Sequence, residues 1–148
     1  MSDRVSRHTS QTCNEQIARQ TAANIARFAH AREFEIDRRM GELDREWDVE
    51  RYLETLAPSF TLFGLGMGLT VNKKWLLLPA LVQSFFLQHA VQGWCPPLAV
   101  LRRLGVRTRE EIDREKYALK ALRGDFQKIP DNVNDANRRS AAAAAVGL

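Results

Sequence analysis

The sequence predicts an all-α integral membrane protein: a two-helix antiparallel hairpin with a long N-terminal and a shorter C-terminal cytoplasmic amphipathic helix. The chain has 148 residues, and two stretches contain no Asp, Glu, Lys or Arg, from Thr55 to Asn72 and from Trp75 to Leu101. Each stretch meets the roughly 17–25 residues that a helix needs to cross a bilayer. A buried hairpin in a soluble bundle is the alternative, but a helix in water usually keeps a polar face, which favours the membrane.

The N-terminal third predicts a charged cytoplasmic helix. Residues 1–11 are polar, are expected to be disordered and do not resemble a signal peptide. Thr12-x-x-Glu15 can cap a helix that covers 12–53, where Gly41 is the one glycine and proline is absent. Apolar residues recur along it at helical spacing: Ile25, Phe28, Ala29, Ile36, Met40, Leu43 and Trp47. This stripe is either a partner surface or packs on the C-terminal helix of the same chain.

The central region, 54–101, predicts the hairpin, with spans at about 55–72 and 75–95. Asn72-Lys73-Lys74 is a tight turn, so the two spans are antiparallel neighbours. Trp75 and Trp94 would be separated by roughly 28 Å on one helix, close to the hydrocarbon thickness of about 30 Å. Aromatic residues prefer the headgroup levels, and Tyr52 would mark that level for the first span.

After the hairpin, residues 102–126 predict an interfacial turn and a cytoplasmic helix. Pro96-Pro97 ends the second span, Gly105 ends a short helix, and Thr108-x-x-Glu111 caps the next. Residues 127–148 are expected to be a disordered tail. Arginines flank both outer ends of the hairpin, which predicts that both termini are cytoplasmic. Arg102 and Arg103 are expected at the membrane interface, facing anionic lipid headgroups rather than nucleic acid.

The two spans carry complementary faces at 100° per residue. The first presents small or polar residues, which include a Gly-x-x-x-Gly spacing: Ala57, Thr61, Gly64, Gly68 and Asn72. The second presents a polar ridge: Ser84, Gln88, Gln92 and Cys95. Small faces let backbones approach and buried amides need partners, so the faces should pack together within one hairpin or in a homodimer.

Cys95 is the candidate reactive thiol. A catalytic cysteine needs a base, and His89 is the only histidine in reach by sequence. On a continuous helix His89 lies about 120° around and roughly 9 Å behind Cys95, which predicts no contact. Free amides and arginines after Pro96-Pro97 predict a thiol pKa near or slightly below its ordinary value. The residues alone favour a structural Cys95, and they indicate no catalytic residue, no cofactor and no metal site.

Residues 51–126 resemble the YgaP-like two-helix membrane domain of bacterial inner-membrane rhodaneses, in particular its free-standing members. The matching segments are NKKWLLLPALV, HAVQGWCPPLAVLRRLGVRT, REEIDREKYALKALRGDF and, upstream of that range, EIDRRMGELDREWDVERYLE, with Trp94-Cys95-Pro96 the most specific mark. The resemblance implies a hairpin in the bacterial inner membrane, often dimeric, in a family associated with sulfur transfer. This chain lacks the rhodanese active-site loop, so sulfurtransferase activity is not carried over.

The leading hypothesis is a non-enzymatic anchor, assembly or interaction module of the inner membrane, a homo-oligomer or a subunit of a larger membrane complex. One alternative is a persulfide relay at Cys95. Another is transport of a small sulfur-containing anion, which needs an oligomer because two helices cannot enclose a path.

Overall fold

The computed structural model describes residues 4–128 and 140–143, and within those ranges it contains helices and no strand. The all-α prediction is confirmed. The elements are α1 (Arg4–Arg7), α2 (Gln11–Arg27), α3 (Glu33–Arg45), α4 (Val49–Thr70), the 3₁₀ helix η1 (Lys73–Leu76), α5 (Leu77–Gln92), α6 (Pro96–Arg103), α7 (Arg109–Arg123) and the 3₁₀ helix η2 (Asp125–Lys128).

The chain divides into two compact units. The hairpin unit comprises Met1–Ala18 and Trp47–Glu110, and the bundle unit comprises Arg19–Glu46 and Glu111–Leu148. Helices α2 and α7 each contribute residues to both units.

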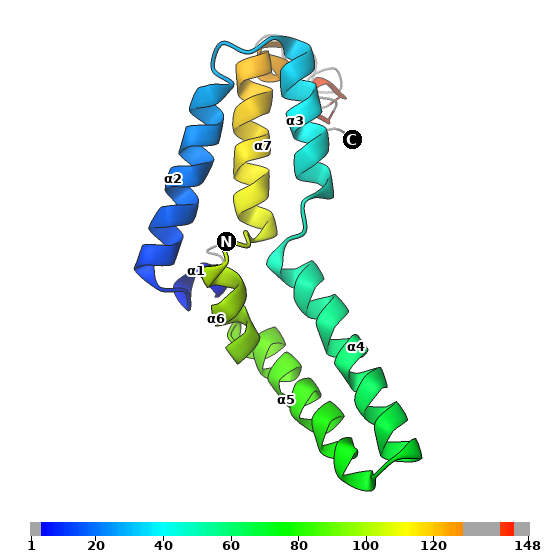
Figure 1. Ribbon diagram of the computed structural model, residues 1–148. Coiled ribbons are helices and arrows are strands. Elements are labelled where there is room, and N and C mark those ends of the chain that lie inside the picture. The colour runs from blue at the N-terminus through cyan, green and yellow to red at the C-terminus, as the bar shows by residue number, and fades with distance from the viewer. Residues whose placement is uncertain (1–3, 129–139, 144–148) are drawn as a thin grey trace. The chain divides into compact units, whose positions relative to one another are not determined.

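An antiparallel pair of helices, α4 and α5, forms the hairpin of the hairpin unit (Figure 1). Asp48 caps α4 by accepting a hydrogen bond from the Arg51 amide at 2.8 Å. At the far end the Asn72 side chain accepts from the Lys74 amide at 2.9 Å, which starts η1 and turns the chain back. The base of the hairpin packs on α1 and α6 around one apolar cluster: Val5, Val49, Leu53, Cys95, Leu98 and Leu101.

The helix boundaries differ from the predicted spans. Helix α4 begins at Val49, so its first two turns contain the charged residues Glu50, Arg51 and Glu54. Helix α5 begins at Leu77 and ends at Gln92. No helix within the described part of the chain combines the length and the apolar character that crossing a membrane requires.

The small-residue face of α4 packs on α5 where Gly64 and Gly68 are buried. A Cβ atom at Gly64 would lie 2.5 Å from Pro79 Cδ, and one at Gly68 would lie 2.5 Å from Leu76 Cδ2. These contacts lie close to the turn, and Asn72 lies beyond α4 as the η1 cap.

The face of α5 that meets α4 is not the predicted one. Ser84 and Gln92 are exposed and Gln88 is half-buried, and the Ser84 hydroxyl donates back to the carbonyl of Ala80. The neighbouring Gln83 instead donates to Thr61 Oγ1 at 2.7 Å. Sequence spacing places Ser84, Gln88 and Gln92 on one face of α5, but it does not determine which face of α5 turns toward α4.

The N-terminal segment is folded where the sequence predicts disorder. Residues 4–7 form α1, and Val5 is buried in the core of the hairpin unit. The start of α2 is capped by Ser10, whose hydroxyl accepts from the Cys13 amide at 3.4 Å, rather than by Thr12.

Arg102 does not lie at a headgroup-facing position, so that prediction is wrong. Its side chain is 2% exposed and donates hydrogen bonds to Thr9 Oγ1 at 3.2 Å and to Asn14 Oδ1 at 2.9 Å. The segment around α1 and the start of α2 therefore supplies the polar partners that a buried guanidinium requires. Arg103, by contrast, is exposed.

The aromatic residues predicted at the membrane interface lie at the surface of the hairpin unit. Tyr52 is half-buried, and its ring centroid lies 5.1 Å from that of Trp47. Trp75 packs edge-on against Phe63, and Trp94 lies in the turn after α5.

In the bundle unit the apolar stripe packs inside the chain. Ile36 and Leu43 of α3 form a buried cluster with Ile112 and Leu119 of α7, and Phe28 and Met40 are among the residues that cover it. Of the two predicted alternatives, packing on the C-terminal helix is therefore confirmed for this part of the stripe. The predicted disordered tail, 127–148, lies mostly outside the described residues.

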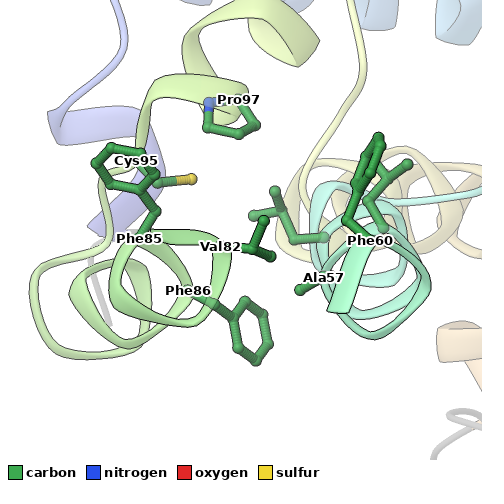
Figure 2. A pocket seen from close by; sticks show the side chains of 9 residues that line it. Ala57, Phe60, Val82, Phe85, Phe86, Cys95 and Pro97 are labelled. Carbon is green, nitrogen blue, oxygen red and sulfur yellow. The ribbon is translucent and has the colours of Figure 1, made fainter. Parts of the chain in front are cut away.

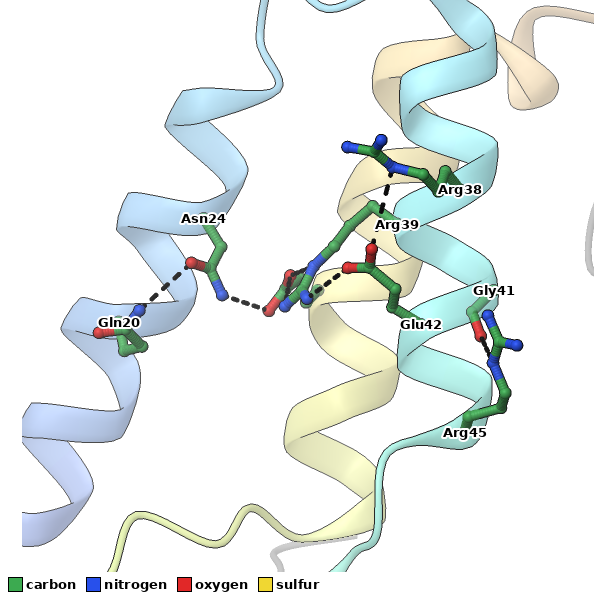
Figure 3. A network of polar contacts seen from close by, with 8 residues as sticks. Gln20, Asn24, Arg38, Arg39, Gly41, Glu42 and Arg45 are labelled. Atoms are coloured by element: carbon green, nitrogen blue, oxygen red, sulfur yellow. Dashed lines mark hydrogen bonds and ion pairs between the residues drawn. The ribbon is translucent and has the colours of Figure 1, made fainter.

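A buried carboxylate links the three helices of this unit (Figure 3). Glu115 of α7 is fully buried and accepts from Arg39 of α3 at 2.9 Å and from Asn24 of α2 at 3.2 Å. Arg39 also pairs with Glu42 at 3.1 Å. Because a buried carboxylate needs such partners, this network specifies how α2, α3 and α7 pack.

Candidate thiol, imidazole and carboxylate site

Three side chains at the base of the hairpin unit form a connected chain of contacts. Cys95 Sγ lies 3.7 Å from His89 Nδ1, and His89 Nε2 lies 3.1 Å from Glu50 Oε2. Cys95 and His89 are buried, at 2% and 5% exposure, whereas the Glu50 side chain is 49% exposed. A nucleophile, a base and an orienting carboxylate in this order are the components of cysteine-dependent acyl transfer.

The turn after α5 produces this contact. Gly93 has φ 76°, the left-handed conformation that commonly ends a helix, and its amide donates to the His89 carbonyl at 2.7 Å. The chain then becomes extended at Cys95, with φ −155° and ψ 160°, before Pro96 starts α6. Cys95 therefore folds back onto the last turn of α5.

The prediction that His89 lies out of reach of Cys95 is wrong. It assumed that one helix continues to residue 95, whereas α5 ends three residues earlier. Gly93 followed by two prolines was the available signal, because glycine ends helices and proline begins new ones. No local sequence pattern indicated the contact of Glu50 with His89, because the two residues are 39 positions apart.

The hydrogen-bond arrangement favours one tautomer of His89. The Glu50 carboxylate can only accept, so Nε2–H donates to it and Nδ1 is left to accept from the thiol. The imidazole is then positioned to take the Cys95 proton.

Burial raises the pKa of the Cys95 thiol. The Leu98 amide at the start of α6 lowers that pKa, and the negative charge of Glu50 raises it further. The expected value near or slightly below the ordinary one is therefore wrong, because burial outweighs the amide contribution. The thiol is therefore protonated near neutral pH.

An apolar cavity of about 130 Å³ lies beside the thiol. Figure 2 shows the Cys95 sulfur pointing into the space that Val82 and Pro97 border. The cavity is lined by residues of α4, α5 and the start of α6: Leu53, Leu56, Ala57, Phe60, Val82, Phe85, Phe86, Cys95 and Pro97. Leu56 and Phe60 are exposed, so the cavity opens to the surface of α4.

A larger and more polar cavity, of about 700 Å³, lies at His89 on its other side. Its charged lining consists of Arg4, Arg7, Glu50, Glu54 and Glu110. Phe86 lines both cavities, and His89, which contacts Cys95, lines the charged one.

Among the described residues, no group of three His, Cys, Asp or Glu side chains is placed to hold a metal ion. No protein-family model, curated protein or solved structure matches this chain.

Proposed function

We propose that this protein is a non-enzymatic anchor or assembly module of the bacterial inner membrane, with the α4–α5 hairpin embedded in the bilayer and both termini in the cytoplasm. The exposed apolar surface of the hairpin carries this proposal. Through it the protein associates with copies of itself or with other membrane proteins, and its flanking helices hold partners at the membrane face.

Large apolar side chains are exposed along both helices and the turn: Phe60, Leu62, Phe63, Leu65, Leu69, Val71, Leu77, Leu81, Leu87 and Val91. Leu69 and Leu77 reach 83% and 73% exposure. Water-soluble monomers seldom expose large contiguous apolar patches, and such patches occur at membrane or protein interaction sites. Lys73 and Lys74 are the only Asp, Glu, Lys or Arg residues from Thr55 to Leu101, so this surface has almost no charge.

The length of the returning arm supports insertion. Helix α5 has 16 residues, or roughly 24 Å, and the four residues of η1 add about 8 Å if they continue its direction. Together they reach the roughly 30 Å of the hydrocarbon core. Lys73 and Lys74 would then lie at the opposite headgroup level, where long basic side chains are tolerated.

A matched pair of lysine substitutions tests the proposal. Leu62 and Leu104 have similar exposure, 70% and 74%, but Leu62 lies in the middle of α4 and Leu104 follows α6. Leu62→Lys should weaken membrane retention by about 3 kcal/mol, since lysine is costly in hydrocarbon, while Leu104→Lys should change little. The measurement is the membrane-bound fraction after an alkaline carbonate wash. Release of the parent protein, or equal retention of both variants, would contradict the proposal.

The topology is tested by single cysteines at Ser2 and Ser140 in a variant without Cys13 and Cys95. Labelling of both only after the inner membrane is permeabilised is expected. Labelling of either one from the periplasmic side would refute cytoplasmic termini.

A second candidate function, a persulfide relay, is favoured by the contact between Cys95 and His89. His89 would take the thiol proton as Cys95 Sγ attacks the outer sulfur of a persulfide, R–S–SH. The donor S–S bond breaks, the released R–S⁻ takes the proton from His89, and Cys95 holds the transferred sulfur as Cys95–S–SH.

Persulfide labelling of the purified protein tests this relay. Cys95→Ser should abolish the label without changing the abundance of the protein, and Cys13→Ser should leave the label in place. A label that survives the loss of Cys95 would exclude the relay.

A further inference from the structure

We propose that Cys95 is an acyl-acceptor site, which takes a short apolar acyl group from a thioester and holds it in the cavity between α4 and α5. The proposal goes beyond the anchoring function. It uses the same thiol as the persulfide relay, and the experiment below distinguishes acyl transfer from sulfur transfer. Two independent features of the site carry it: the chain of contacts from Cys95 through His89 to Glu50, and the apolar cavity at the sulfur.

The chain of contacts supplies the transfer step. His89 Nδ1, 3.7 Å from the sulfur, takes the thiol proton while Sγ attacks the carbonyl carbon of R–CO–S–R′. A new C–S bond forms to Cys95, the old C–S bond breaks, and R′–S⁻ takes the proton from His89 to leave as R′–SH. The Glu50 carboxylate, 3.1 Å from Nε2, stabilises the imidazolium that forms between these transfers. No oxidant or reductant is required.

The cavity sets the size of the acyl group. An apolar cavity of 150 Å³ holds a benzene molecule, so about 130 Å³ suits a group of about four to six carbons. Its walls beside the sulfur, Val82, Phe85 and Pro97, offer no hydrogen-bonding side chain to an acyl group. A single transferred sulfur atom would fill only part of this space, which is why the acyl group fits better.

The two cavities separate the parts of an acyl donor. The apolar chain enters beside Cys95, and the polar carrier of the thioester lies toward the larger cavity at His89, which has both basic and acidic walls. Once transferred, the acyl group lies among the apolar side chains of Ala57, Phe85 and Phe86, and the cavity is open on the side of Leu56 and Phe60.

The test uses the full chain in mild detergent with neutral N-acetylcysteamine thioesters of different acyl length. Intact-protein mass spectrometry measures the acyl adduct, and neutral hydroxylamine identifies it as a thioester. One adduct per chain is expected, formed fastest with the butanoyl to hexanoyl groups and at least tenfold slower with dodecanoyl. Equal rates for all lengths would overturn the role of the cavity.

Variants locate the adduct and its base. Cys95→Ala should abolish the adduct, while Cys13→Ala, which removes the other cysteine, should leave it unchanged. His89→Gln should slow acylation on the order of a hundredfold, the usual contribution of a general base. Val82→Phe narrows the cavity and should slow hexanoyl transfer more than acetyl transfer, which a misfolded variant would not do.

Several outcomes would refute the proposal. These are an adduct on Cys13, an undiminished rate in a folded His89→Gln variant, or no adduct from any thioester. If the same preparation gains one sulfur atom from a persulfide donor but no acyl group from any thioester, the persulfide relay stands and the acyl site does not.

Discussion

A single methyl group at Gly64 should destabilise the hairpin relative to the same change at Gly66. An added Cβ at Gly64 would lie 2.5 Å from Pro79 Cδ, 3.2 Å from Leu78 Cβ and 3.3 Å from the Pro79 nitrogen. These atoms belong to a rigid ring and to the α5 backbone, so the two helices must move apart. At Gly66, on the same helix, an added Cβ would meet nothing within 4 Å.

The magnitudes follow from two opposing effects. Replacing glycine by alanine inside a helix stabilises it by about 0.8–1.0 kcal/mol, while overpacking a tight contact costs about 1–3 kcal/mol. Gly66→Ala should therefore gain up to about 1 kcal/mol. Gly64→Ala should lose roughly 0–2 kcal/mol, so the two variants should differ by about 1–3 kcal/mol.

Thermal unfolding in mild detergent, followed by circular dichroism at 222 nm, measures the difference. At this chain length about 1 kcal/mol corresponds to roughly 2–4 °C in Tm. Gly68→Ala should fall between the other two, because its close neighbour is the side chain of Leu76, which is 40% exposed and can turn away. Equal Tm values for Gly64→Ala and Gly66→Ala would refute the close packing of α4 on α5.

Three further predictions concern the bundle unit and the thiol. Glu115→Ala should cost about 1–3 kcal/mol in urea unfolding because it removes the buried acceptor of Arg39 and Asn24, while Arg39 keeps Glu42 as a partner. Glu42→Ala, at a half-exposed ion pair, should cost less than about 1 kcal/mol; similar losses would refute the structural role of Glu115. The alkylation rate of Cys95 should reach its pH midpoint at a higher pH than that of free glutathione, because the thiol pKa is raised; a lower midpoint would contradict this. The free energy of unfolding that the raised pKa contributes should be present below the ordinary thiol pKa and be lost as pH rises through the raised pKa. Gly93→Ala should lower the free energy of unfolding by more than about 1 kcal/mol, because φ is 76° and the new Cβ would lie 2.7 Å from Arg4 Cβ. The same change should alter the Cys95 alkylation rate, and a variant as stable as the parent protein would refute the strain.

The sequence alone predicts the helical class and the turn of the hairpin, because these depend on local composition. The absence of charge from Thr55 to Asn72, and the Asn72-Lys73-Lys74 turn that follows, mark where one helix ends and the chain reverses. The start of α4 was not predictable in this way. Charge density suggested a boundary near Thr55, but Asp48 provides a cap and the helix continues through Glu50 and Glu54.

The helix faces and the thiol site depend on phase and on distant contacts, so sequence spacing misplaces them. Spacing groups Ser84 with Gln88 and Gln92 on one face of α5, but packing against α4 decides which face turns inward, and Gln83 rather than Ser84 meets Thr61. The burial of Arg102 was also not predictable from the sequence, because its hydrogen-bond partners Thr9 and Asn14 come from a segment with no apolar pattern.

The position of the thiol site follows from the way charge changes along α4. Glu50, Leu53 and Ala57 are spaced by three and four residues, so they lie on one face of the helix, which turns 100° per residue. The first of them holds the carboxylate against His89, and the other two line the apolar cavity at Cys95. Beyond Ala57 the helix carries no further charge, and its most exposed leucines, Leu62 and Leu69, lie in that part. The proton-accepting end of the site therefore lies on the charged side of the membrane boundary proposed for the hairpin, and the acyl-holding end lies on the apolar side. The proposed reaction moves an apolar group from a water-soluble carrier to Cys95, and the site offers a suitable environment for each of them.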